Sequence, residues 1–139
     1  MSRTLDPHPG ERAPAPPDGR MTVAAVLDTV AIVVFVAVGR RTHEQEPGLA
    51  GVFATAAPFL IALLVGWIAL RAWRRPFAPL TGLGVWAVTI VGGMLLRNLV
   101  FGDGTASEFV IVAAGFTAAC MLGWRAVAGA VDQARRRAR

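Results

Sequence analysis

The stretch LAGVFATAAPFLIALLVGWIAL, residues 49–70, decides the fold of this chain because it contains no charged side chain. A bilayer core about 30 Å thick is crossed by roughly 20 helical residues, so this segment is long enough to span it unaided. It is too long for one strand of a sheet, and its apolar residues do not alternate with polar ones. We therefore predict a transmembrane helix here.

Three further apolar segments have the same character, which predicts an all-α membrane protein, a bundle of four transmembrane helices. The spans are expected at about 22–39, 49–70, 80–100 and 106–124. None of them has the polar face that a helix on the surface of a soluble domain needs. A cleaved signal peptide is an alternative for the first span, but its apolar run exceeds the usual 7–15 residues.

Composition agrees with this domain organisation. The chain is 55% hydrophobic and 17% charged, whereas soluble domains are about 25% charged. Residues 1–21, interrupted by several prolines, are expected to form a disordered tail, residues 22–125 the membrane domain, and residues 126–139 an Arg-rich tail. Cys120 is the single cysteine and no lysine is present, which excludes an internal disulfide, a Cys-based zinc cluster and lysine Schiff-base catalysis.

The arginines predict the orientation. Four spans place both termini and the middle loop on one side, which holds eleven of the fourteen arginines; the other side holds Arg40, Arg41 and Arg97. The positive-inside rule then places both termini in the cytoplasm of a multi-pass plasma-membrane protein. All four tryptophans fall toward the cytoplasmic helix ends, where indole rings favour the headgroup region.

Asp28 is the most informative polar residue, since a carboxylate within a span is expensive. Small residues share its helical face and valines occupy the opposite one, so Asp28 is expected to point into the bundle. It is either a proton or cation site, or an anchor that pairs with an arginine. Arg71 or Arg125 could bend inward from the cytoplasmic interface to reach it.

Arg97 is the second candidate for an intramembrane or interfacial polar site. It is expected about 16 Å from Asp28 in depth, which excludes a direct salt bridge between them. It either snorkels to the outer surface or pairs with Asp103 or Glu108. Pro58 lies inside the second span, where a kink is expected because proline removes a backbone hydrogen bond.

The sequence offers no catalytic constellation and no metal or cofactor site. His43, near two glutamates in the outer loop, is the only histidine outside the N-terminal tail, which is too few ligands for a metal. The basic residues at the C-terminus are expected to attract anionic lipid headgroups rather than nucleic acid, because no aromatic residues interleave with them.

Several short motifs together resemble the domain of unknown function 3054 family of small prokaryotic membrane proteins, over about residues 22–128. They are Asp28, GRRTH at 39–43, APFL at 57–60, GW at 66–67, Trp86, Thr89, GMLLR at 93–97, GDGT at 102–105, Phe109 and GWR at 123–125. Thr42 stands where serine is expected. The resemblance implies a four-span membrane protein and suggests that Arg40 and His43 form a pair at the outer surface. It implies no enzymatic or transport activity.

Three functions are consistent with these features. The first is an integral membrane protein that acts through packing, as a homo-oligomer or as an accessory subunit of another membrane protein. The second is a small transporter or channel component that uses Asp28 as a protonatable site and the Pro58 kink as a cavity wall. The third, a membrane enzyme using His43, Glu44 and Arg97, ranks last because few acid–base groups converge.

Overall fold

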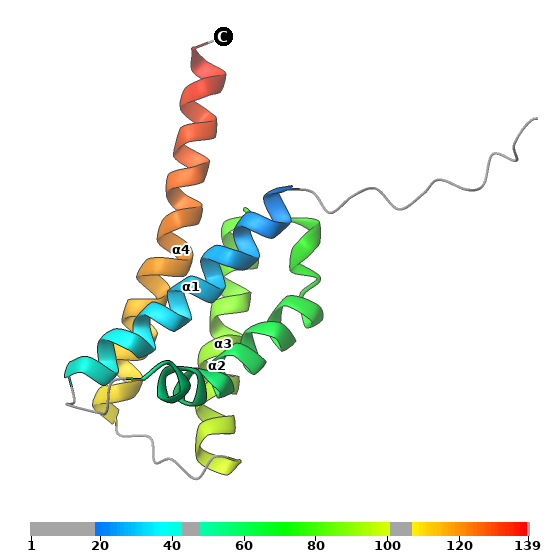
Figure 1. Ribbon diagram of the computed structural model, residues 1–139. Coiled ribbons are helices and arrows are strands. Elements are labelled where there is room, and N and C mark those ends of the chain that lie inside the picture. The colour runs from blue at the N-terminus through cyan, green and yellow to red at the C-terminus, as the bar shows by residue number, and fades with distance from the viewer. Residues whose placement is uncertain (1–18, 43–47, 101–106, 139) are drawn as a thin grey trace, which may run out of the picture.

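The computed structural model describes residues 19–42, 48–100 and 107–138, and these form a bundle of long helices (Figure 1). The elements in chain order are α1 (Gly19–Thr42), α2 (Leu49–Ala69), the short 3-10 helix η1 (Ala72–Arg74), α3 (Pro79–Leu99) and α4 (Ser107–Arg137). The described residues contain no strand, and four of their helices are long and apolar enough to cross a membrane. The predicted fold class is confirmed.

The ends of the second and third helices lie within a residue of the predicted ones. α3 begins at Pro79, whose fixed φ angle and missing N–H suit the first position of a helix. α1 is longer than the predicted 22–39 at both ends. The remainder of the N-terminal tail lies outside the described residues. So do the two segments with His43 and Asp103 that were expected to form the outer loops.

The fourth helix corrects the prediction for the C-terminus. The span was expected to end at Trp124 and to be followed by a tail, but α4 continues without a break to Arg137. No proline follows Trp124, and the alanines and arginines there are strong helix formers. Asp132 and Arg136 add an exposed ion pair one turn apart, with 3.0 Å between Oδ2 and Nη2. Figure 1 shows the last turns of α4 extending beyond the other helices.

The helices pack in a ring, in which α1 and α3 each contact both α2 and α4. The core contains mainly Ala24, Ile32 and Phe35 of α1, Phe59 and Leu63 of α2, Val85 of α3, and Ala113 and Met121 of α4. The predicted faces of α1 are confirmed, because the small-residue face is buried whereas Val23, Val26 and Val30 are exposed. Exposed aliphatic side chains also cover the outside of α2, α3 and α4, as a bundle surrounded by lipid requires.

One glycine sets a close helix crossing between α2 and α3. A Cβ atom at Gly93 would collide with the ring of Phe59, so the absence of a side chain allows Phe59 to lie against the α3 backbone.

Pro58, the residue before that phenylalanine, is buried inside α2. Figure 1 shows the first turns of α2 along their axis and its later turns running across the view, so the helix bends along its length. A proline in the interior accounts for such a bend.

Candidate functional site

Asp28 lies at the centre of a polar cluster inside the bundle and is 0% exposed. Its Oδ1 accepts hydrogen bonds from Nη1 of Arg125 at 2.7 Å and from Nε1 of Trp124 at 3.0 Å. Its Oδ2 accepts from Nη2 of Arg125 at 2.8 Å and from Nε1 of Trp67 at 3.1 Å. Each carboxylate oxygen therefore receives one guanidinium and one indole donor.

Arg125 is bound as completely as the acid and is 1% exposed. Besides the two-pronged contact with Asp28, its Nη1 donates to the backbone carbonyl of Met121 at 2.7 Å, and its Nε donates to the carbonyl of Pro76 at 3.0 Å. The guanidinium carbon also lies 4.2 Å from the ring centroid of Trp124. All three nitrogens of the guanidinium group thus have acceptors, which offsets the cost of burying the charge.

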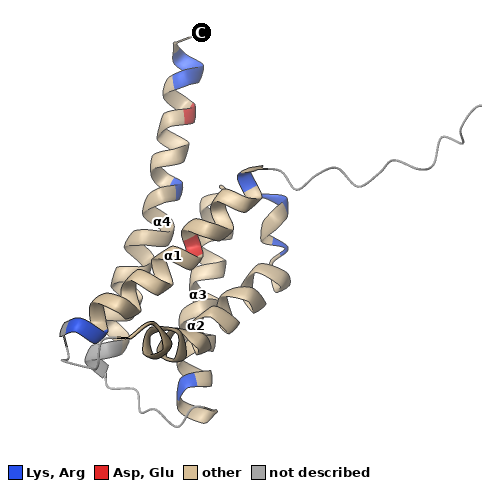
Figure 2. Cartoon of the chain, in the orientation of Figure 1, with Lys and Arg blue, Asp and Glu red and all other residues tan. Residues whose placement is uncertain are grey.

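The cluster joins segments that are distant in the sequence. Asp28 belongs to α1, Trp67 to α2, and Trp124 and Arg125 to α4, while Pro76 lies in the segment between η1 and α3. The remaining helix, α3, contributes space. A Cβ atom at Gly82 would lie 2.5 Å from Cδ of Arg125, so only glycine leaves room for the arginine stem beneath α3. Figure 2 shows the single acidic segment of α1 beside the other helices in the middle of the bundle.

The sequence pointed to part of this cluster. Asp28 does face the bundle, and of the two arginines considered as its partners, Arg125 makes the contact. Arg71 instead lines a pocket at the η1 end of the molecule. Arg97 is in the last turn of α3, at the end of that helix away from η1, and its predicted separation from Asp28 in depth stays a prediction.

Three of the four tryptophans make hydrogen bonds inside the bundle, which the sequence did not predict. Trp67 is 7% exposed and donates to Asp28 together with Trp124. Trp86 donates from Nε1 to Thr117 Oγ1 and to the carbonyl of Ala114, both at 3.2 Å, and so links α3 to α4. Of the four, Trp73 alone is exposed. A tryptophan near a span end can lie at the headgroup level or donate a hydrogen bond inside the bundle. Which of the two it does depends on the helical face that it occupies.

The outer-end candidates are only partly described. Arg40 donates from Nη1 to Thr55 Oγ1 at 3.1 Å, and Thr55 donates in turn to the carbonyl of Gly51 at 2.9 Å, so this contact joins α1 to α2. The predicted pairing of Arg40 with His43 lies outside the described residues, as does Asp103, and the side chain of Glu108 is also not described. Thr55 is therefore part of a helix contact next to Arg40.

Chemically, the Asp28 cluster is suited to holding helices together. A carboxylate with four donors in place has no acceptor position left for a further ligand in this arrangement. Within the described ranges, no group of three or more His, Cys, Asp or Glu side chains could hold a metal ion. The geometry is that of a saturated buried ion pair, which fixes the relative register of α1, α2 and α4.

Comparison with known proteins identifies a family. The model of a family described as a protein of unknown function, DUF3054, matches residues 25–128, which include all four side chains of the Asp28 cluster and Gly82. No curated protein and no solved structure matches the chain. The chain belongs to the DUF3054 family, and it is a multi-pass membrane protein by the length and composition of its four helices.

Proposed function

We propose that this DUF3054 protein is a structural or accessory subunit of the prokaryotic plasma membrane, with both termini on the cytoplasmic side. In this role it acts by packing against another membrane protein or against further copies of itself. The alternative is a transporter or channel component that uses Asp28 as its intramembrane acid.

The saturation of Asp28 is the observation that favours the structural role. An ion or proton carrier needs a carboxylate that can exchange partners during the cycle. Here the exchange would break contacts with Arg125, Trp67 and Trp124 at once, and it would leave a buried guanidinium without its counter-charge. Breaking a buried ion pair by removing one partner destabilises a protein by about 3–5 kcal/mol. Asp28 is thus suited to stabilising the fold that other subunits recognise.

The distribution of arginines supports the proposed orientation. The start of α1, the η1 segment and the end of α4 lie at the same end of the bundle (Figure 1). That end carries Arg20, Arg71, Arg74, Arg75, Arg135, Arg136 and Arg137 among the described residues. Figure 2 shows blue segments there and also at the opposite end, where the last turns of α1 and α3 carry Arg40, Arg41 and Arg97. Under the positive-inside rule the end with more arginines faces the cytoplasm. A C-terminal alkaline phosphatase fusion is expected to be inactive, and a C-terminal green fluorescent protein fusion fluorescent.

Asp28→Asn tests the structural role directly. The substitution keeps the size of the side chain but removes the charge opposite Arg125, so we expect lower accumulation in the membrane and loss of the native assembly in mild detergent. Asp132→Asn is the matched control, because it removes the same charge from an exposed acid of α4.

Flux through proteoliposomes separates the two functions. The structural role predicts no specific ion or substrate flux for the wild-type protein. A wild-type flux that Asp28→Asn abolishes, in a variant of normal abundance and normal oligomer size, would favour the transporter and refute the structural role.

A further inference from the structure

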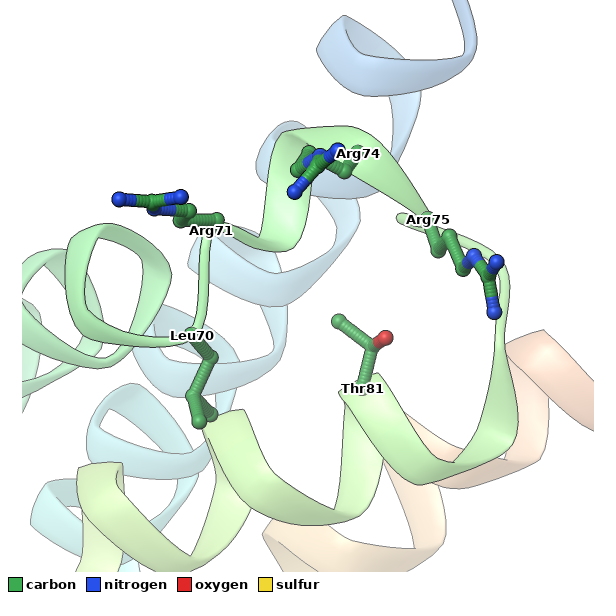
Figure 3. Close-up of a pocket in the computed structure, with 5 residues that line it drawn as sticks. All are labelled: Leu70, Arg71, Arg74, Arg75 and Thr81. Carbon is green, nitrogen blue, oxygen red and sulfur yellow. The ribbon is translucent and has the colours of Figure 1, made fainter.

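A pocket of about 430 Å³ lies between the end of α2 and the beginning of α3, and it is lined by Leu70, Arg71, Arg74, Arg75 and Thr81. Figure 3 shows the Thr81 side chain pointing into the space below the η1 segment, with the three arginines placed along the backbone that borders it. Arg71 and Arg75 lie on opposite sides, with their side chains extending outward, and Arg74 lies between them. The pocket therefore has one hydroxyl inside and three arginine residues at its border.

These three positive charges are not neutralised by the part of the chain that the structure describes. Its ion pairs are those of Arg125 with Asp28 and of Arg136 with Asp132, and neither acid reaches the pocket. All three arginines are exposed. Three adjacent guanidinium groups without a counter-charge favour an anionic ligand, and their planar forks match the oxygens of a phosphate group.

The beginning of α3 adds a second attraction for an anion. The N-cap residue, Ala78, makes no side-chain hydrogen bond to the helix, and Pro79 follows it. The helical hydrogen-bond pattern begins at Gly82, whose N–H donates to the carbonyl of Ala78 at 3.0 Å. The N–H groups of Leu80 and Thr81 thus precede the helical hydrogen-bond ladder, at the positive end of the helix dipole and next to the pocket.

The backbone holds the arginines in place at this border. Arg71 has φ 48° and ψ 48°, a left-handed conformation that non-glycine residues adopt rarely. Hydrogen bonds fix it on both sides, from the N–H of Arg71 to the carbonyl of Ile68 and from the N–H of Arg74 to the carbonyl of Arg71. Ala72, between them, is buried. Backbone hydrogen bonds therefore hold the turn that presents the three arginines, and their side chains would need to turn inward to contact a ligand.

We propose that this pocket binds the phosphate group of an anionic phospholipid. The inference rests on the proposed function for the placement of this loop at the cytoplasmic membrane surface. α2 ends at Ala69 and α3 begins at Pro79, so the pocket lies where two spans leave the hydrocarbon, at the level of the headgroups. Leu70 provides an apolar wall on the membrane side, next to which an acyl chain can lie.

The test compares two triple variants of the full-length protein in mild detergent. The pocket variant is Arg71→Gln, Arg74→Gln and Arg75→Gln; the control is Arg135→Gln, Arg136→Gln and Arg137→Gln, which removes the same charge from the same end of the molecule. Native mass spectrometry gives the Kd for the first bound phosphatidylglycerol. With about fivefold for each charge next to the lipid phosphate, the pocket variant should bind the first lipid about a hundredfold more weakly. The control should stay close to wild type at this first site.

Three results would overturn the proposal. Equal weakening in both triple variants would show that overall charge, and not the pocket, attracts the lipid. Phosphatidylcholine bound as tightly as phosphatidylglycerol would remove the requirement for an anion. Inorganic phosphate at low millimolar concentration that displaces all phosphatidylglycerol would identify a soluble phosphate as the ligand.

Two smaller changes protect the test against misfolding. Arg74→Gln alone should weaken the first site about fivefold, and Thr81→Val should weaken it further in combination. Both leave the left-handed Arg71 in place. Failure here is separable from failure of the proposed function, because Asp28→Asn assembly measurements do not involve the pocket.

Discussion

Replacing Gly82 by alanine is the sharpest test of the packing around the ion pair. The added Cβ would lie 2.5 Å from Cδ and 2.8 Å from Nε of Arg125, whereas ordinary contacts begin at 3.4 Å. Either the arginine stem or α3 must therefore move by about 0.9 Å, the difference between 3.4 and 2.5 Å. The stem cannot swing away freely, because the guanidinium group that it carries donates hydrogen bonds to Asp28, Met121 and Pro76.

The size of the effect follows from that displacement. A shift of this size would lengthen the 3.0 Å bond from Nε of Arg125 to Pro76 beyond hydrogen-bonding range if it acted along the bond. Overpacking of a tight core costs about 1–3 kcal/mol. Alanine also favours a helix over glycine by up to about 1 kcal/mol, which offsets part of the loss.

Gly115→Ala is the control that removes the helix-propensity effect. Gly115 lies within α4, and nothing lies within 4 Å of a Cβ placed there. The free energy of unfolding in mixed micelles, followed by circular dichroism during titration with dodecyl sulfate, should be lower for Gly82→Ala than for Gly115→Ala by about 1–3 kcal/mol. Equal stability of the two variants would refute the reasoning, because it would show that Arg125 is not confined by α3.

Further substitutions test individual polar contacts, within the Asp28 cluster and outside it. Trp67→Phe removes one donor to Asp28, and the lost hydrogen bond to a charged group should lower the free energy of unfolding by about 1.5–3 kcal/mol in the same titration. An unchanged free energy of unfolding would show that this indole hydrogen bond is dispensable. Arg125→Lys keeps the charge, but a lysine cannot give two parallel hydrogen bonds to Asp28 and a third to the carbonyl of Pro76. It should therefore destabilise the bundle nearly as much as Arg125→Gln. Wild-type stability of the lysine variant would show that charge alone matters. Asp132→Asn breaks only an exposed pair with Arg136, and a change above about 1 kcal/mol would contradict its solvent-screened geometry.

The sequence was sufficient for the architecture because span length and the absence of charge follow directly from the properties of a bilayer. It also predicted the direction of Asp28, since small residues occupy one side of α1 and valines the other. Arg125 was a plausible partner because it lies just past the predicted end of the fourth span, within reach of an acid near the same end of the bundle. These predictions needed only helical periodicity and the lengths of side chains.

The remaining features depend on geometry between segments. Trp67 and Trp124 occupy positions typical of an aromatic belt, and nothing in their spacing indicates that both indoles converge on one carboxylate. Gly82 gives no signal until Arg125 is seen beneath it. The pocket requires the turn at Arg71, whose left-handed backbone the tertiary structure imposes on a residue that does not favour it.

The ion pair also has a consequence for biosynthesis. Its acid is in α1 and its base is in α4, so Asp28 is translated well before Arg125. A chain interrupted earlier keeps an acid without its cation in the lipid phase, where it is costly. The charge of Asp28 is therefore balanced only once α4 has been made and has packed against α1.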